Sequence, residues 1–382
     1  MDTPHVLNKP MTVGKCQLKH RVVLPPLTRF RADKNHVPHD FVADYYSQRG
    51  SVPGTLLITE GTFISPKAGG YDNVPGIYND EQIKGWKKVT DAVHAKGSYI
   101  YVQLWALGRV AVSSILAKDG YDVHAPSAIR MNARGFTGSE STLPREMTEE
   151  EIQDYLAQFA HAAKCAVAAG FDGVEVHGAN GYLIDQFTQS VSNQRTDKWG
   201  GSYENRARFG LEVTKACVDA IGADRVAYRV SPWGTFQEMG MESEDIISQF
   251  EYLVQKLTEM NLSYIHGVES RVNGPLDAER PDYKSLDFLA DLVQKVNPEV
   301  AFISSGGHTI ETASKIVAER PNQKVATGHG RYFISNPDLP FRIFNNIAQT
   351  EWDRNVFYVP EDPKGYSDYT FCEEFKAAAG KL

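Results

Sequence analysis

The chain of 382 residues is 42% hydrophobic and 23% charged, a composition typical of a globular protein with a large buried core. Its formal net charge of −8 and the lack of a Lys/Arg-rich run argue against a nucleic-acid-binding surface. The four cysteines lie far apart without a CxxC pair, which indicates reduced thiols rather than a disulfide framework.

Short β-branched strands alternate with amphipathic helices along most of the chain. A hairpin is expected at residues 13–18, before the first strand. The expected strands span residues 22–24, 56–58, 99–104, 173–177, 226–230, 264–266, 300–304 and 325–327. Apolar residues at helical spacing predict helices between them, and the clearest begins at a capping box of Thr148 and Glu151 and ends near Gly170.

Eight strands separated by helical crossovers predict an α/β fold, a closed (β/α)8 TIM barrel that spans residues 1–382 as a single domain. A doubly wound sheet is the runner-up, but no GxGxxG sequence follows a strand. We expect the N-terminal hairpin to close the bottom of the barrel. The stretch from about 110 to 145, after the third strand, is too long for a plain connection, and we expect it to cap the active-site mouth.

No targeting or membrane segment is evident. Residues 1–20 carry no apolar segment suited to a secretory signal, and no stretch approaches the ~18 apolar residues of a membrane span. The sequence therefore predicts a cytoplasmic protein with no membrane or nucleic-acid partner. The C-terminal Gly380-Lys381-Leu382 is a poor match to the peroxisomal Ser-Lys-Leu signal, so a peroxisome is the weaker alternative.

Polar residues gather where the expected strands end, which is where a (β/α)8 barrel builds its active site. These positions, with their glycines, are Thr28, Gln103, His177, Asn180, Arg229, Gly306, Gly307, Gly330 and Arg331. A lone strand Gln or Arg is more often a structural hydrogen bonder, but together they favour one site. His177 and Asn180 can donate two hydrogen bonds to a carbonyl oxygen, and Tyr182 can hand a proton to a nearby carbon.

The glycine pairs after strands seven and eight lie where such barrels usually bind phosphate, and Arg331 strengthens that interpretation. A phosphorylated ligand whose polar head reaches Thr28, Gln103 and Arg229 has the shape of flavin mononucleotide (FMN). Arg229 would lie near the pyrimidine end of the flavin, where a cation favours reduction.

Five segments carry a family resemblance: residues 25–32 (PPLTRFRA), 102–105 (VQLW), 177–182 (HGANGY), 193–206 (NQRTDKWGGSYENR) and 330–339 (GRYFISNPDL). In this order they resemble the old yellow enzyme family of flavin-dependent ene-reductases, and the fungal branch that includes relatives of ergot-alkaloid biosynthesis. The resemblance extends over nearly the whole chain. It implies a TIM barrel that holds FMN tightly but without a covalent bond.

The resemblance implies roles for single residues. Contacts with FMN are implied for Pro26, Leu27, Thr28, Gln103, Arg229, Gly307 and Arg331. His177 and Asn180 would bind the carbonyl oxygen of an α,β-unsaturated substrate, so that flavin N5 delivers hydride to the β-carbon and Tyr182 protonates the α-carbon. Tyr358 would line the substrate pocket, and Trp105 would shape that pocket or pack in the core.

The resemblance also implies NADPH as the transient reductant, docked over the flavin in the pocket that the alkene later occupies, with ping-pong kinetics. An isomerase or oxidative member of the same family stays open as an alternative, as does a non-catalytic flavin-binding protein. A glycosidase that uses Glu60 and Glu175 is a further rival. No histidine cluster has metal-ligand spacing, so no metal is expected. A homodimer is compatible with the sequence, which leaves the oligomeric state open.

Overall fold

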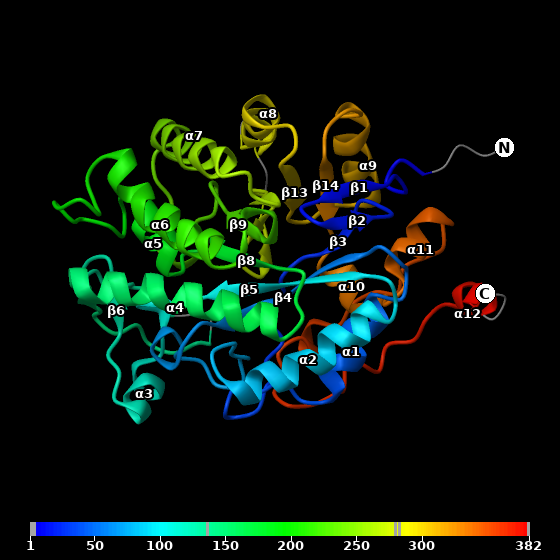
Figure 1. Ribbon diagram of the computed structural model, residues 1–382, viewed down its shortest axis with the longest axis horizontal. Coiled ribbons are helices and arrows are strands. Elements are labelled where there is room, and N and C mark those ends of the chain that lie inside the picture. Colours follow the sequence, from blue (N-terminus) through cyan, green and yellow to red (C-terminus); the bar gives the residue numbers. More distant parts are fainter. Residues whose placement is uncertain (1–4, 135–136, 279–280, 282–283, 380–382) are drawn as a thin grey trace.

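Eight parallel strands form a closed barrel in the computed structural model, which describes residues 5–134, 137–278, 281 and 284–379 (Figure 1). In chain order they are β3 (Val22–Leu24), β4 (Leu56–Phe63), β5 (Tyr99–Trp105), β8 (Gly173–Gly178), β9 (Val226–Val230), β10 (Tyr264–Val268), β13 (Ala301–Ser305) and β14 (Val325–Gly328). Each strand pairs with the next, and β14 pairs with β3 to close the ring. The predicted (β/α)8 barrel is confirmed.

Helices surround the strands (Figure 1). The longer ones are α1 (Phe41–Arg49), α2 (Asp80–His94), α4 (Glu149–Ala168), α6 (Tyr203–Ile221), α7 (Ser243–Glu259), α8 (Asp287–Val296) and α9 (Ile310–Glu319). The shorter ones are α5 (Leu183–Thr188), α10 (Arg331–Ser335), α11 (Leu339–Phe344) and α12 (Glu373–Ala379). The capping box of Thr148 and Glu151 begins α4 as predicted, and Gly170 follows its end with φ +90°. In the described part of the chain, no helix combines the length and apolarity that a membrane crossing needs.

The N-terminal hairpin plugs one end of the barrel. Strands β1 (Met11–Val13) and β2 (Cys16–Leu18) pair in antiparallel fashion, and their buried side chains join one cluster with inward-facing barrel residues such as Val23 and Ile303. Gly14 makes the turn with φ +52°, and a Cβ there would lie 2.1 Å from the carbonyl oxygen of Asp224. The expected hairpin is therefore confirmed, and the close approach explains the glycine.

Strand β4 is longer than the sequence indicated. The apolar run predicts 56–58 only, whereas the strand continues to Phe63 after a register shift between Ile58 and Gly61. The continuation approaches β5 so closely that a Cβ on Gly61 would lie 2.5 Å from the Trp105 ring. Glycine at this position therefore allows the indole of Trp105 to lie against the strand.

The insertion after the third barrel strand contains two short strands that lie side by side. A short helix, α3 (Ser113–Leu116), is followed by β6 (His124–Ala125), which pairs in parallel with β7 (Arg145–Glu146) just before α4. The predicted insertion, from about 110 to 145, falls between β5 and α4. Its role as a cap stays a prediction.

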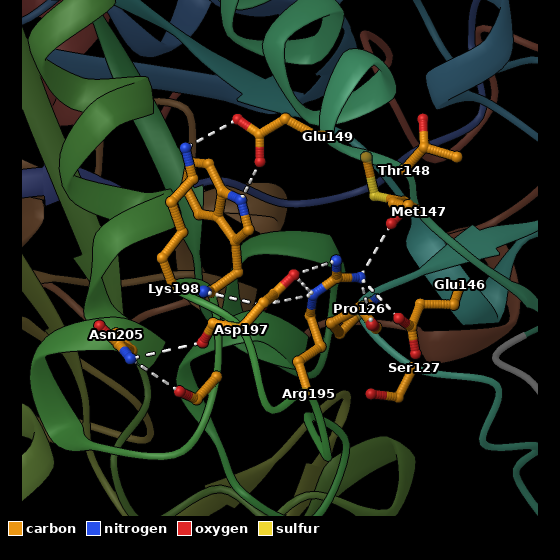
Figure 2. A network of polar contacts seen from close by, with 12 residues as sticks. Pro126, Ser127, Glu146, Met147, Thr148, Glu149, Arg195, Asp197, Lys198 and Asn205 are labelled. Carbon is orange, nitrogen blue, oxygen red and sulfur yellow. Dashed lines mark hydrogen bonds and ion pairs between the residues drawn. The ribbon is translucent and has the colours of Figure 1, made fainter.

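Arg195, on the segment between α5 and α6, links the residues that follow β6 and β7 (Figure 2). Its guanidinium donates to the carbonyl oxygens of Pro126 and Met147, at 3.0 and 2.8 Å, and pairs with Glu146 at 3.2 Å. Asp197 holds the same guanidinium at 2.6 Å. One buried cation thus satisfies the carbonyl group that follows each of the two strands. Together these contacts form the Arg195 clasp.

Residues that follow Arg195 in the chain contact the first turn of α4. Lys198 pairs with Glu149 at 2.9 Å, and the Trp199 indole donates to the same carboxylate at 2.6 Å (Figure 2). Asn205 donates to the carbonyl oxygen of Gly200 at 3.0 Å. The segment 193–206, one of those that carry the family resemblance, therefore has a structural role in this chain.

Replacing Arg195 with methionine should lower the free energy of unfolding by about 2–4 kcal/mol, because two buried carbonyl groups lose their donor. Urea denaturation followed by circular dichroism measures the change. Lys215→Met, which breaks the exposed i,i+4 pair with Asp219, is the control and should cost less than about 0.5 kcal/mol. If both variants lowered the free energy of unfolding equally, the stabilising role of the Arg195 clasp would be contradicted.

Candidate active site

A cavity of about 440 Å³ opens at the carboxyl ends of the barrel strands. Its walls include every predicted site residue: Pro26, Leu27, Thr28, Gln103, Trp105, His177, Asn180, Tyr182, Arg229, Gly306, Gly307, Gly330, Arg331 and Tyr358. These residues come from six barrel strands or the loops that follow them, and from the segment after α11. The structure thus brings the predicted residues together, while their roles stay predictions.

His177 and Arg229 face each other across the register of β8 and β9. Both are buried, and neither His177 Nδ1 nor Arg229 Nε has a hydrogen-bond partner within the described part of the chain. Burial, reinforced by the positive charge of Arg229, holds the pKa of His177 well below its usual value. His177 is therefore a neutral imidazole with one N–H to donate.

Asn180 is held in a left-handed conformation, φ +58°, by bonds to its own backbone. Its N–H donates to Ser231 Oγ at 2.7 Å, and its carbonyl oxygen accepts from Gln237 Nε2 at 2.9 Å. The next N–H, of Gly181, donates to the buried carboxyl of Asp185 at 2.8 Å. With the backbone fixed in this way, the carboxamide of Asn180 is left to line the cavity.

Tyr182 lies among aromatic rings at the cavity wall. Its ring meets the edge of Trp105 at 4.7 Å between centroids and lies 5.1 Å from the His177 ring. Burial raises the pKa of Tyr182 above its usual value. The phenol therefore stays protonated at neutral pH, as a proton donor must.

The glycine loop after β13 forms the opposite wall. Gly306 and Gly307 have φ values of +116° and +66°, and a Cβ on Gly306 would lie 3.0 Å from the backbone nitrogen of Glu269. Both positions therefore require glycine, and the loop can approach a ligand closely.

Arg331 lines the cavity, but its guanidinium is bound to Asp277 of β12 (Leu276–Asp277) through both terminal nitrogens. Strand β12 forms a small hairpin with β11 (Val272–Asn273). Arg331 in turn lowers the pKa of the Asp277 carboxyl. A phosphate that uses Arg331 would therefore join or replace this carboxylate.

The donor set fits FMN. Buried polar atoms without protein partners suit a bound ligand, and Arg229 Nε is one of them among the described residues. Arg229, Gln103 and Thr28 suit the polar edge of a flavin, while the glycine loop and Arg331 suit a phosphate.

Several wall residues were missed from the sequence: Ser305, His308, His329, Phe236, Trp352 and Asp277. Burial lowers the pKa of His329 to about 4, so this imidazole is neutral. Gln237, beside Phe236, adopts φ +60° and holds Asn180. The irregular turn that contains these two residues has no periodic pattern, so no sequence signal could have found them.

The glycosidase alternative is wrong. Glu60 accepts from the backbone N–H groups of Arg29 and Phe30, and burial raises its pKa to about 7. Glu175 bonds to Gln103 and His266. Both carboxyls are buried and neither lines the cavity. Within the described ranges, no group of three His, Cys, Asp or Glu side chains is arranged to hold a metal ion.

A second cavity, of about 960 Å³, adjoins the first and shares Phe236, Pro275 and Tyr358 with it. Its lining from the insertion includes Val112, Ile115 and Arg134. Residues of the insertion thus contribute to this outer cavity, whereas none of those that the structure describes lines the inner one. The C-terminal Gly380-Lys381-Leu382, which raised the peroxisomal alternative, lies outside the described residues.

Known proteins share both the sequence and the fold. Residues 6–350 match the NADH:flavin oxidoreductase / NADH oxidase family. Chanoclavine-I aldehyde reductase fgaOx3 of Penicillium roqueforti is 53% identical, over 97% of each chain. NADP-dependent oxidoreductase lnbE of Aspergillus flavus is 49% identical, over 96% of each chain. A relative from Epichloe festucae var. lolii, 47% identical over 96% of this chain and 95% of its own, is named a probable inactive reductase, easA.

Among solved structures, morphinone reductase in complex with tetrahydroNAD superposes with a TM-score of 0.86. It is 35% identical and covers 97% of this chain and 98% of its own. The family match over most of the chain, together with this identity and shared barrel, settles the class of protein. The chain is an oxidoreductase of the FMN-dependent NADH:flavin oxidoreductase / NADH oxidase family, the family of old yellow enzyme.

Proposed function

We propose that the protein is an NADPH-dependent ene-reductase that acts on an α,β-unsaturated carbonyl compound. The observation that carries the proposal is the convergence of His177, Asn180 and Tyr182 on one cavity. Flavin binding alone requires none of the three, so their meeting favours turnover over a non-catalytic flavin-binding protein.

The neutral imidazole of His177 and the carboxamide of Asn180 donate to the substrate carbonyl oxygen and stabilise the negative charge that develops there. FMN, when bound, supplies the hydride for the β-carbon. Tyr182, protonated and buried beside His177, gives its proton to the α-carbon. Trp105 and Tyr358 complete the walls that orient the alkene.

Gln103, Thr28 and Arg229 hold the flavin head in this proposal, with backbone contacts from Pro26 and Leu27. Gly306, Gly307, Gly330 and Arg331 hold the phosphate. Arg229 is the buried cation of the site, and it favours the reduced, negatively charged form of the cofactor.

NADPH is the proposed reductant, docked in the same cavity before the alkene enters, which gives ping-pong kinetics. The name of lnbE, an NADP-dependent oxidoreductase, supports NADPH, and the complex of morphinone reductase with tetrahydroNAD supports a nicotinamide cofactor as reductant. The name of fgaOx3, an aldehyde reductase, makes an unsaturated aldehyde a reasonable first substrate to test. An isomerase or oxidative role is the second candidate; Tyr182 argues against it, since some relatives that isomerise carry Phe at this position.

Anaerobic stopped flow of the purified, FMN-loaded protein tests the proposal. NADPH should bleach the flavin absorbance, and 2-cyclohexenone or an unsaturated aldehyde should then restore it. Conversion of the enone without consumption of NADPH would instead favour the isomerase. A protein that acquires no flavin band even with added FMN would contradict the cofactor assignment.

Tyr182→Phe should slow the second half-reaction by about 10²- to 10⁴-fold, because the α-carbon loses its proton donor. Bleaching by NADPH should be unchanged. Tyr71→Phe is a matched control, since the Tyr71 ring also meets Trp105, at 5.9 Å, and its hydroxyl has no partner among the described residues. Equal loss in both variants would remove Tyr182 from the chemistry.

Arg331→Met should weaken FMN binding to the apoprotein by about tenfold, because a charged hydrogen bond to phosphate is lost. Riboflavin, which lacks the phosphate, should bind both proteins equally. Quenching of flavin fluorescence measures the four affinities. A parallel loss of riboflavin binding would show that Arg331 shapes the site without contacting the phosphate.

A further inference from the structure

A buried carboxylate lies beneath the cavity and links two of its walls. The Glu175 side chain is 0% exposed. Its Oε1 accepts from Gln103 Nε2 at 2.7 Å, and its Oε2 bonds to His266 Nδ1 at 2.8 Å. The other ring nitrogen of His266 lies 2.7 Å from Ser305 Oγ. Gln103 and Ser305 line the cavity, whereas Glu175 and His266 do not.

This chain of four side chains crosses the barrel. Around the ring the strands follow the order β10-β13-β14-β3-β4-β5-β8-β9, so β5 with Gln103 and β13 with Ser305 stand on opposite sides. Gln103 belongs to the wall proposed for the flavin head, and Ser305 directly precedes the glycine loop. Gly328 leaves space for the Ser305 side chain at the β13 end of this network, since a Cβ on Gly328 would lie 1.9 Å from Ser305 Oγ.

Hydrogen-bond chemistry gives this network one polarity. An ionised carboxylate accepts only, so both atoms that bond to Glu175 must be N–H groups. The Gln103 amide therefore turns its nitrogen to Glu175 and its oxygen away from it. His266, if neutral, carries its proton on Nδ1, so Nε2 accepts the Ser305 hydroxyl proton and the Ser305 oxygen keeps only acceptor capacity.

The protonation states agree with this geometry. Burial alone would raise the pKa of the Glu175 carboxyl, but the hydrogen bonds from His266 and Gln103 and the positive charge of Arg229 act against it, and the pKa lies below its usual value. Burial lowers the pKa of His266 more than Glu175 raises it. At neutral pH the network therefore holds one negative charge and a neutral imidazole.

The negative charge of Glu175 partly neutralises the positive charge of Arg229. Arg229 lies in register with His266 on one side and follows Ala227, the register partner of Glu175, on the other. The Glu175 charge favours the charged form of Arg229, which burial disfavours. A buried cation without such a counter-charge is costly.

We propose that Glu175 is a positioning residue of the FMN site, which fixes the orientation of the Gln103 amide and the tautomer of His266 and offsets the charge of Arg229. The inference rests on the assignment of the cavity to FMN. Through this network, one carboxylate determines which hydrogen-bonding atoms both walls present to the cofactor. It also sets how strongly the buried cation favours flavin reduction.

Glu175→Gln is the direct test, because a carboxamide offers one acceptor where the carboxylate offers two. Either the Gln103 amide must flip, or His266 must move its proton to Nε2. Binding of FMN to the apoprotein should weaken by about tenfold. The flavin reduction potential should become more positive, because Arg229 loses its counter-charge.

Asp338→Asn is the matched control. Asp338 is also a buried carboxylate, but it lies just before α11, where it pairs with Arg342 at 2.7 Å. The Asp338→Asn variant should have a lower thermal stability, while its FMN affinity and its flavin reduction potential stay at wild-type values. A Glu175→Gln protein that loses stability alone, with wild-type affinity and potential, would overturn the proposal.

A measurement on the unmutated protein keeps the inference testable if Glu175→Gln does not fold. The ¹⁵N chemical shifts of His266, identified by comparison with His266→Gln, should show a neutral ring protonated on Nδ1 at pH 7. An Nε2–H tautomer or an imidazolium would overturn the proposal. This result does not depend on turnover, so a failure of the proposed reductase activity is distinguishable from a failure of the network.

Discussion

The parallel register of the closed barrel is the constraint on which the site depends. All eight strands run in one direction, so their carboxyl ends meet at a single rim. His177, Arg229 and His266 are register partners on three consecutive strands, so a neutral imidazole and a permanent cation lie close together in a low dielectric. Burial, reinforced by that proximity, suppresses protonation of His177, and the buried cation of Arg229 requires a counter-charge. The electrostatics of the cavity thus follow from the strand pairing.

This constraint explains why so much of the site could be predicted from the sequence. Once the strands were recognised, the rule that barrel strands end at the active site carried Thr28, Gln103, Arg229 and the glycine loops to one place. The family motifs agreed with that placement. The end of β4 was missed because Thr59, Glu60 and Gly61 interrupt its apolar run. The hydrogen bonds that satisfy the buried Glu60 carboxyl come from the backbone N–H groups of Arg29 and Phe30, which lie far from it in the sequence. Only the three-dimensional structure reveals them.

Interactions between distant residues could not be predicted. Arg331 was placed at the phosphate end, but its partner Asp277 stands 54 positions earlier in the chain, in a hairpin with no recognisable pattern. His266 bonds to Glu175 across 91 positions. Phe236 and Gln237 belong to a turn in which Gln237 and Glu238 adopt left-handed conformations that side-chain-bearing residues rarely take. Local propensity contains no signal for such a turn, which tertiary contacts hold in place.

The clasp around Arg195 has an evolutionary consequence. Because β6 pairs with β7, and one guanidinium binds the carbonyl group that follows each strand, the chain that leaves β6 returns to it before α4 begins. The entropic cost of closing such a loop grows only slowly with its length. Among the intervening residues that the structure describes, Ala133, Arg134, Thr137 and Ser139 line the outer cavity. The intervening segment can therefore be lengthened, shortened or exchanged as a cassette, which lets selection alter what approaches the flavin without disturbing the barrel beneath it.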